Sequence, residues 1–341
     1  MSRYMAPAFK KVTFLPAFFG TALYTLHRPA IPRHGKPNMK ISARSLGLWL
    51  GLPFGLLLLL AIACWWYWFH APFQRLAPVE YGRRDGRPLV FEAFRPPTQN
   101  GAGVLLMVSG GWKSGPGSIR PELFAPFLRR GYTVFAIQHI SQPDCTISGI
   151  VEDVNRAVRY VRLHAAEYGV DGARLGVIGG SSGGHLSLML GTTGRAGDPA
   201  AADPVERESS AVQCVACFYP PTDLLNLGSS TENPGDGGPP KSFVDGFGIR
   251  AKSMATWRVL GRELSPIYHV SSSMPPTFIV HGDADTLVPL DQSRRFVAAA
   301  EQTGATVRLE VREGQGHGWP SMIFDIVRFA DWFDQHLAAQ P

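Results

Sequence analysis

The chain has 341 residues, of which 45% are hydrophobic and 18% are charged, so it is long enough for one large α/β domain with extensions or for two smaller domains. Its net charge of +6 does not indicate a nucleic-acid-binding protein. Residues 1–45 hold eight basic and no acidic side chains, and the remainder is close to neutral, with 25 basic and 27 acidic residues. We therefore predict a basic N-terminal tail over residues 1–45 and no nucleic-acid partner.

An uncharged apolar stretch of 24 residues follows, LGLWLGLPFGLLLLLAIACWWYWF over residues 46–69. This length is enough to cross a bilayer as a helix, and the aromatic cluster at its end, Trp65 to Trp68, is typical of a membrane interface. The basic residues all precede the stretch, so the positive-inside rule places the N-terminus in the cytoplasm. The sequence predicts a transmembrane anchor over residues 46–70, a membrane partner, and a catalytic domain on the extracytoplasmic side.

Two alternatives for this segment stay open. The chain could begin at Met39, in which case the apolar stretch resembles a cleaved signal sequence. The segment ending at Cys64 also loosely resembles a lipoprotein box, which would replace the anchor by a lipid. Residues 71–85, which contain two prolines and a glycine, are predicted to be a linker.

From residue 86 onward, apolar strand-like runs alternate with helical patterns. The helical pattern of residues 147–168 places apolar side chains on one face at three- and four-residue spacing. Strands alternating with amphipathic helices predict an α/β domain over residues 86–341, with a mainly parallel sheet covered by helices on both faces. The predicted strands are 89–94, 103–109, 133–138, 175–179, 212–219, 277–281 and 307–311, and the other predicted helices are 121–130, 186–191, 291–303 and 319–338.

The segment Gly179-Gly-Ser-Ser-Gly-Gly-His185 lies between a predicted strand and a predicted helix. It contains the pattern G-x-S-x-G twice, centred on Ser181 or on Ser182. This pattern is typical of a nucleophile elbow, in which a strained turn exposes a serine at the carboxyl edge of a sheet and glycines let strand and helix approach closely. A glycine-rich turn with a phosphate-binding role, or with none, is the alternative.

Cys214 and Cys217 have C-x-x-C spacing but lie in an apolar run that predicts a buried strand. Residues three apart on a strand point to opposite faces, and no second pair completes a zinc site. We interpret both as core cysteines and predict no metal and no cofactor. Residues 222–268 are rich in glycine and proline and are predicted to be an insertion that forms a partial lid.

A serine nucleophile needs a base, and the base needs an orienting acid. Asp283 and Asp285 follow the predicted strand 277–281, and His317 lies between the last predicted strand and the last predicted helix. Either aspartate could instead be a turn former, and His317 a solvated loop residue. The three motifs occur in the order serine, acid, histidine, each at a strand end, which favours a catalytic role for all of them.

These motifs together resemble α/β-hydrolase-fold esterases, including the acetyl- and feruloyl-esterase-like and dienelactone-hydrolase-like branches, over about residues 86–338. The elbow resembles the G-x-S-A-G-G-H-L segment of that group, which identifies Ser181 as the nucleophile. The segment His281 to Pro289 resembles H-G-x-x-D-x-x-V-P and implies Asp285 as the acid, and Gly314 to Trp319 resembles the loop that carries the base, His317.

The segment Val108-Ser-Gly-Gly-Trp-Lys113 resembles the H-G-G-x-W loop of bacterial esterases, although Ser109 stands where that loop has histidine. The resemblance implies an oxyanion hole built from the backbone N–H groups of Gly111 or Trp112 together with Ser182.

The resemblance implies hydrolysis of small-molecule carboxylic esters through an acyl-Ser181 intermediate. Two alternatives stay open: a serine peptidase related to the prolyl oligopeptidases, and a catalytically silent interaction protein tethered to a membrane. The motifs indicate serine chemistry strongly but indicate the substrate poorly, because many activities share this fold.

Overall fold

The computed structural model describes the backbone of residues 43–338 and the side chains of residues 53–338. Each predicted strand corresponds to an observed one, with ends that differ by at most two residues. The strands are β1 (Gln74–Arg75), β2 (Val79–Arg84), β3 (Arg87–Arg95), β4 (Gly103–Met107), β5 (Thr133–Ile137), β6 (Leu175–Gly180), β7 (Cys214–Phe218), β8 (Thr277–Gly282) and β9 (Val307–Arg312). The helices are α1 (Ala43–Phe69), α2 (Pro121–Arg129), α3 (Ile147–Leu163), α4 (Ser182–Thr193), α5 (Pro204–Arg207), α6 (Met254–Glu263), α7 (Asp291–Thr303) and α8 (Met322–His336).

The strands form one sheet in the order β1-β3-β5-β4-β6-β7-β8-β9, with β2 paired to β3. β3 runs antiparallel to β5, and the strands from β5 through β4 to β9 are parallel to one another. The carboxyl ends of parallel strands lie at the same edge of a sheet, so the loops after β4, β6, β8 and β9 meet there. The mainly parallel α/β architecture is as predicted.

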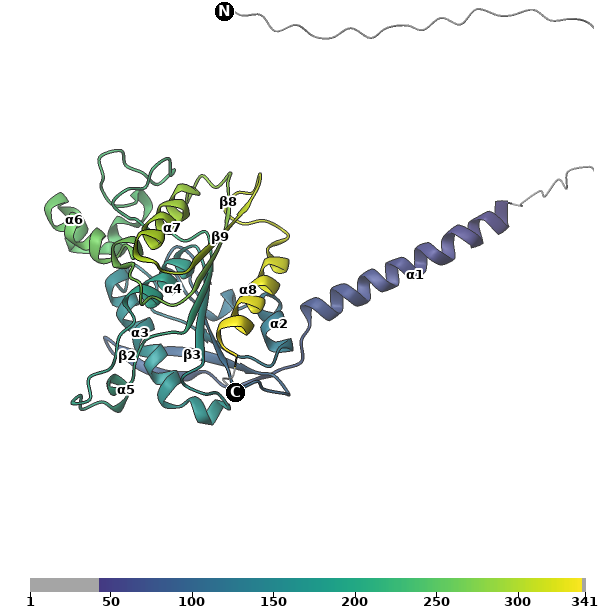
Figure 1. Cartoon of the computed structure of the whole chain (residues 1–341), viewed down its shortest axis with the longest axis horizontal. Helices are drawn as coiled ribbons and strands as arrows, with labels where there is room; N and C mark the ends of the chain where they lie inside the picture. Colours follow the sequence, from purple (N-terminus) through teal and green to yellow (C-terminus); the bar gives the residue numbers. More distant parts are fainter. Residues whose placement is uncertain (1–42, 339–341) are drawn as a thin grey trace, which may run out of the picture. The chain divides into compact units, whose positions relative to one another are not determined.

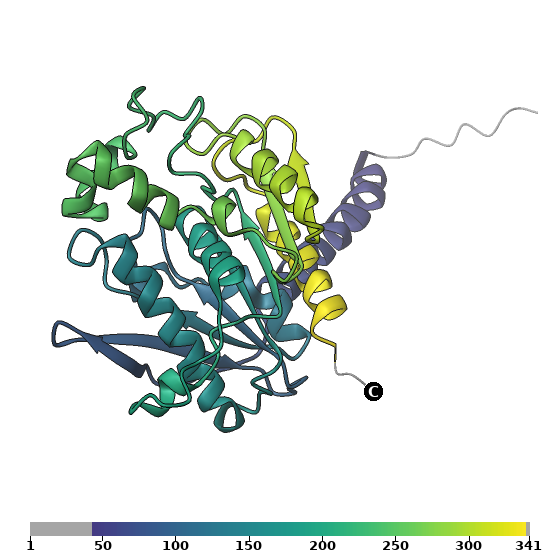
Figure 2. The same ribbon diagram turned by 60° about the vertical axis from the view of Figure 1, so that its left-hand side comes forward.

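Helices cover both faces of this sheet, as predicted (Figure 1 and Figure 2). Val134 and Ala136 of β5 pack in a core with α2 and α8, whereas Phe135 and Ile137 of the same strand pack in a second core with α3 and α4. This alternation is the period of two that a strand imposes on its side chains. The helices therefore bury one apolar stripe each against opposite faces of the sheet.

The two cysteines of β7 follow the same alternation. Cys214 belongs to the core beneath α8, and Cys217 belongs to the core beneath α4. Both side chains are buried with free thiols, and burial raises the pKa of Cys217 and of Cys214 above the usual value for a thiol. The interpretation of both residues as core cysteines is confirmed.

The chain divides into two units, residues 1–56 and residues 57–341. Helix α1 covers most of the predicted membrane span, residues 46–70. Among the residues that the structure describes, no helix combines the length and the apolarity that a membrane crossing requires, so the predicted transmembrane helix is not supported. The side chains described on α1 begin at residue 53, and the part from there to its end is shorter than the ~20 residues that span a bilayer. The predicted tail before residue 43, with Met39, lies outside the described residues.

The linker predicted over residues 71–85 is instead part of the sheet. Two strands, β1 and β2, lie within it and pair antiparallel with β3. Tyr81 in β2 is buried, and its hydroxyl donates a hydrogen bond of 2.8 Å to the carbonyl oxygen of Gln138. The strands were missed because they are short and mostly exposed, and because their register is interrupted between Glu80 and Gly82.

The insertion predicted over residues 222–268 contains α6 and several short 3₁₀ turns, one of which is Lys241–Phe247. Leu224, Phe247 and Trp257 are buried and join the core beneath α3 and α4. This segment is therefore anchored by apolar packing, and part of it borders the loop that follows β4.

Candidate active site

Ser181 occupies a sharp turn between β6 and α4 with strained backbone angles, φ 55° and ψ −122°. The turn requires glycine on both sides. A Cβ atom at Gly179 would lie 2.3 Å from the carbonyl oxygen of Gly183, and one at Gly183 would lie 2.7 Å from that of Met107. The strain projects the Ser181 hydroxyl beyond the sheet edge, at the N-terminus of α4.

The structure brings Ser181, His317 and Asp285 into one hydrogen-bonded chain. Nε2 of His317 lies 2.9 Å from Oγ of Ser181, and Nδ1 of His317 lies 2.7 Å from Oδ2 of Asp285. A carboxylate only accepts hydrogen bonds, so Nδ1 carries the proton and Nε2 is free to accept one from the serine. The three side chains come from the loops after β6, β8 and β9, which share one sheet edge.

Asp285 is held in its ionised form. Its other oxygen, Oδ1, accepts hydrogen bonds of 2.9 Å from the backbone N–H groups of Leu287 and Val288. Burial alone would raise the pKa of this carboxyl, but hydrogen bonds from His281, His317 and the Val288 N–H group outweigh burial and hold it below its usual range. Asp283 is exposed and accepts a hydrogen bond of 2.7 Å from the Gly314 N–H group, so it links the loop after β8 to the loop after β9 and does not contact His317.

The loop after β4 faces Ser181 with free backbone donors. The Gly110 N–H group is occupied, because it donates to the carbonyl oxygen of Lys113. Gly111 and Trp112 have positive φ values of 56° and 53°, and within residues 43–338 their N–H groups donate no hydrogen bond. Ser182 begins α4, so its N–H group has no partner inside the helix. These three groups are the ones predicted for an oxyanion hole.

The start of this loop is tied to the helix behind the serine. The hydroxyls of Ser109 and Ser182 lie 3.1 Å apart, and Ser109 Oγ lies 3.0 Å from Nε2 of His139. Nδ1 of His139 lies 2.9 Å from the carbonyl oxygen of Ile140, which only accepts, so Nε2 is the acceptor. The Ser182 hydroxyl therefore donates to Ser109, and the Ser109 hydroxyl donates to a neutral His139. Burial lowers the pKa of His139, although its hydrogen bond to Ile140 acts in the opposite direction.

The end of the loop is held in a similar way. The indole N–H group of Trp112 donates to Nδ1 of His185 at 3.2 Å, and Nε2 of His185 donates to the carbonyl oxygen of Leu264 at 2.7 Å. His185 is buried, and burial lowers its pKa to about 4 although the bond to Leu264 acts in the opposite direction. A neutral histidine thus supports each end of the loop.

Sequence reasoning missed these supporting residues. His185 lies inside the elbow motif, but the motif alone does not show that its ring reaches Trp112. Tyr219 was also missed: its ring lies 4.4 Å from that of His317, and it has a positive φ of 33° after β7. Burial raises its pKa to about 12, so its hydroxyl stays protonated beside the histidine. The available signal for two of them was their position at strand ends: His139 lies two residues after β5, and Tyr219 directly follows β7.

Two cavities border Ser181. The larger has a volume of about 800 Å³ and is lined by Ser181, His317 and mainly apolar side chains of α2 and α8. The smaller has a volume of about 80 Å³ and is lined by Ser181, Trp112, the carboxylate residue Glu232, and apolar residues of the insertion and of the loop after β8. The first is within the usual size range of small-molecule sites.

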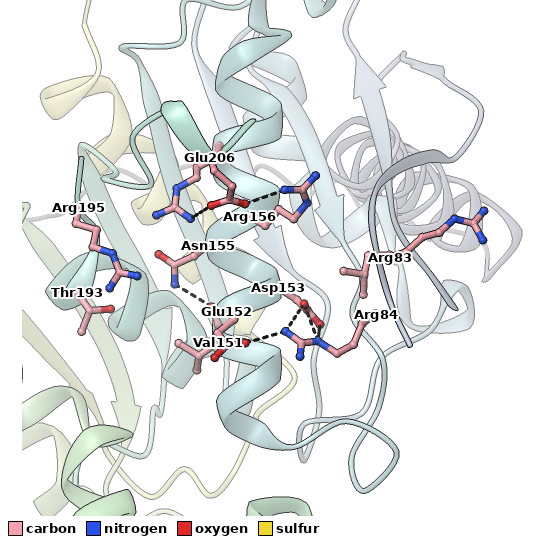
Figure 3. A pocket seen from close by; sticks show the side chains of 12 residues that line it. Arg83, Arg84, Val151, Glu152, Asp153, Asn155, Arg156, Thr193, Arg195 and Glu206 are labelled. Atoms are coloured by element: carbon pink, nitrogen blue, oxygen red, sulfur yellow. Dashed lines mark hydrogen bonds and ion pairs between the residues drawn. The ribbon is translucent and has the colours of Figure 1, made fainter. Parts of the chain in front are cut away.

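A third cavity, of about 550 Å³, lies between β2, α3 and α5 and is polar (Figure 3). Arg84 pairs there with Glu152 and Asp153, and Glu206 accepts hydrogen bonds from both Arg156 and Arg159. No serine or histidine lines this cavity. The hydroxyl that lines it, on Thr193, donates to the carbonyl oxygen of Met189, so the cavity lacks a hydroxyl paired with a histidine base as at Ser181.

No group of three or more potential ligand side chains with metal-binding geometry occurs within residues 43–338.

The BD-FAE family model matches residues 93–300. Esterase LipQ of Mycobacterium tuberculosis is 34% identical over 60% of this chain and 47% of its own length. The probable carboxylic ester hydrolase LipM of the same organism is 30% identical over 65% of this chain and 50% of its own.

The chain therefore spans about half the length of these curated relatives. Among solved structures, esterase 2 of Thermogutta terrifontis with butyrate bound is 27% identical, with a TM-score of 0.60 over 78% of this chain and 96% of that one. A truncated carbohydrate esterase from gut microbiota, 24% identical, shares the fold with a TM-score of 0.62 over 78% and 97%.

Proposed function

The chain belongs to the BD-FAE family, and from this membership and the site geometry we propose that it is a serine-dependent carboxylic-ester hydrolase of the α/β-hydrolase esterase superfamily. The observation that carries the proposal is the continuous hydrogen-bonded chain from Ser181 through His317 to Asp285, with free backbone N–H groups opposite the serine. The relatives' names, esterase and carboxylic ester hydrolase, support ester rather than amide chemistry.

In the proposed first step, Nε2 of His317 takes the Ser181 proton while Oγ attacks the carbonyl carbon of the ester. Asp285 keeps the proton on Nδ1 and stabilises the imidazolium that forms. Negative charge develops on the carbonyl oxygen, which receives hydrogen bonds from the Ser182 N–H group and from that of Gly111 or Trp112. The N-terminus of α4 favours the same charge.

The tetrahedral intermediate then breaks its bond to the alcohol oxygen, and His317 gives its proton to that oxygen. A water molecule then attacks the carbonyl carbon of the acyl-Ser181 intermediate and gives a proton to His317. The bond to Ser181 Oγ breaks, and His317 returns the proton to that oxygen. The products are a carboxylic acid and an alcohol, and the enzyme returns to its starting state without a cofactor.

The test combines labelling with hydrolysis. We expect a fluorophosphonate probe to label the purified chain and Ser181→Ala to abolish labelling, with a loss of several orders of magnitude in kcat on p-nitrophenyl esters. Ser182→Ala is the matched control and should keep labelling. Labelling that survives Ser181→Ala and is lost in Ser182→Ala would show that the nucleophile was assigned in the wrong register.

The same measurements separate the alternatives. A serine peptidase would cleave aminoacyl amides faster than matched esters, whereas an esterase would do the reverse. A catalytically silent interaction protein would be neither labelled nor active on either class of substrate. Feruloyl and acetylated-sugar esters extend the panel within the ester class.

We further propose that residues 46–70 attach the chain to a membrane, with the catalytic unit on the extracytoplasmic side. The support is the exposure of large apolar side chains from Phe54 to Trp68 and the clustering of basic residues before residue 46. Fractionation of cells that express the full chain, followed by protease treatment of intact cells, tests both attachment and side.

A further inference from the structure

The two cavities that border Ser181 differ tenfold in volume, about 800 Å³ against about 80 Å³. An ester places one part on each side of its reacting carbon, the acyl group and the alcohol. Both cavities are lined by Ser181, so each can receive one of these two parts.

The leaving-group chemistry of the proposed function decides the assignment. When the tetrahedral intermediate collapses, the bond between carbon and alcohol oxygen breaks, its electron pair stays on that oxygen, and the Nε2 proton of His317 moves to it. The alcohol oxygen must therefore lie within hydrogen-bond reach of His317. His317 lines the larger cavity and not the smaller one, so the alcohol extends into the larger cavity.

The smaller cavity is then left for the acyl chain. It lies beside Gly111, Trp112 and Ser182, the residues around the developing oxyanion, where the remaining substituent of the carbonyl carbon must point. At about 80 Å³ this cavity has a tenth of the volume of the larger one, so it has room for a short acyl chain only.

One wall of the smaller cavity, formed by Leu224 and Trp112, belongs to the packed interior, whereas Glu232 and Phe243 are half-buried. Leu224 is fully buried, and Trp112 is 4% exposed, with its ring 5.2 Å from that of Phe243 and 5.8 Å from that of Phe247. Phe247 in turn packs against Trp257 of α6. Moving the wall formed by Trp112 and Leu224 would disrupt close-packed side chains, and this costs more free energy than moving a loosely packed loop.

The larger cavity is apolar and reaches the surface. Phe124 of α2 and Ile323, Ile326 and Phe329 of α8 line it, together with Leu123, which is 46% exposed. Apolar walls favour an apolar alcohol, since each methylene buried is worth about 0.8 kcal/mol.

We propose that this protein, if it is the ester hydrolase inferred above, is selective for esters that join a short acyl group to a bulky apolar alcohol. Trp112 and Phe243 limit the acyl chain, and the side chains between α2 and α8 bind the alcohol. The insertion that contains Phe243 thus sets acyl length.

Two isomeric esters test the assignment on the full chain. Hexyl acetate and ethyl hexanoate contain the same atoms, with the long chain on the alcohol in one and on the acid in the other. We expect kcat/KM to be at least about tenfold higher for hexyl acetate, because a single misplaced methylene already costs roughly tenfold or more in an apolar pocket. Equal rates, or a preference for ethyl hexanoate, overturn the inference while leaving ester hydrolysis intact. Cleavage of neither, without fluorophosphonate labelling, overturns the proposed function itself.

Two variants show which wall sets each preference. Phe243→Ala should raise the kcat/KM ratio of ethyl hexanoate to ethyl acetate, and Leu123→Trp should lower the ratio of hexyl acetate to ethyl acetate. Val259→Trp, at an exposed position of α6 that lines neither cavity, is the control and should change neither ratio. If Phe243→Ala instead raises the hexyl acetate ratio, the two cavities are assigned the wrong way round.

Discussion

Two aspartates follow β8, and at the scale of single residues their surroundings differ completely. Asp285 is buried, accepts two backbone hydrogen bonds and contacts His317. Asp283 is exposed and accepts a hydrogen bond from the Gly314 N–H group in the loop after β9. We expect Asp285→Asn to lower kcat by roughly 10⁴-fold, because an amide stabilises the wrong histidine tautomer. Steady-state kinetics on a p-nitrophenyl ester would measure this loss.

Asp283→Asn is the matched control, since an amide oxygen can still accept the Gly314 N–H bond. It should retain most activity. Similar losses in the two variants would mean that both substitutions act by distorting the loop after β8. The assignment of Asp285 as the orienting acid would then be contradicted.

His185 should make stability depend on pH. Burial lowers its pKa to about 4 in the folded chain, against about 6.5 when unfolded, so between these values the unfolded chain binds more protons. Stability therefore falls as pH drops from about 6.5 to about 4, by up to about 3 kcal/mol from this residue. Urea unfolding at several pH values would measure the slope.

His185→Gln isolates this contribution, because glutamine can accept from Trp112 and donate to Leu264 without titrating. The variant should show a slope flatter by up to one proton. An unchanged slope would assign the pH dependence to other buried groups. Asp153, whose pKa burial raises to about 6 against the opposing effect of Arg84, acts with the opposite sign in this pH range.

At the scale of elements, the site depends on how the loop after β4 meets the start of α4. Ser109 and Ser182 share one hydrogen bond across this contact, with His139 behind it. We expect Ser109→Ala and Ser182→Ala each to lower kcat by less than about tenfold with little change in KM, because each loosens the oxyanion donors and removes none. The double variant should be no worse than the more damaging single one.

A double-mutant cycle on kcat measures this coupling. Fully additive losses would show that the two hydroxyls act independently. His139→Phe would serve as a further probe, since it removes the acceptor at the end of the chain and should reproduce the Ser109→Ala loss.

At the scale of the whole molecule, all excess positive charge and the long apolar stretch precede residue 70, and the site residues follow residue 108. We expect a chain that lacks residues 1–69 to fold, to hydrolyse p-nitrophenyl acetate and to leave the membrane fraction. It keeps β1 and the buried Ala71, so the sheet stays complete. Circular dichroism, ester hydrolysis and cell fractionation would check the three parts.

An inactive but folded truncated chain, beside an active full chain in detergent, would contradict this separation. In that case the end of α1, where Phe69 lines the larger cavity, would belong to the path of the substrate.

Local pattern was enough to predict the parallel sheet and most helices, and to place a serine, an acid and a histidine at strand ends. The choice of Ser181 over Ser182 and of Asp285 over Asp283 came from the resemblance to α/β-hydrolase esterases. A strand that ends in a glycine-flanked serine, and acidic and basic residues at later strand ends, must meet at one edge of a parallel sheet. The pairing of β1 and β2 was not predictable in this way, since short and exposed strands carry little periodic signal.

Only the tertiary structure decided the surroundings of those residues. The contacts of His185 with Trp112, of His139 with Ser109 and of Tyr219 with His317 join residues that are 73, 30 and 98 positions apart. The sizes of the two cavities depend in the same way on packing between α2, α8 and the insertion. Such contacts follow from the close packing of segments distant in sequence, and no local pattern of residues specifies how those segments pack.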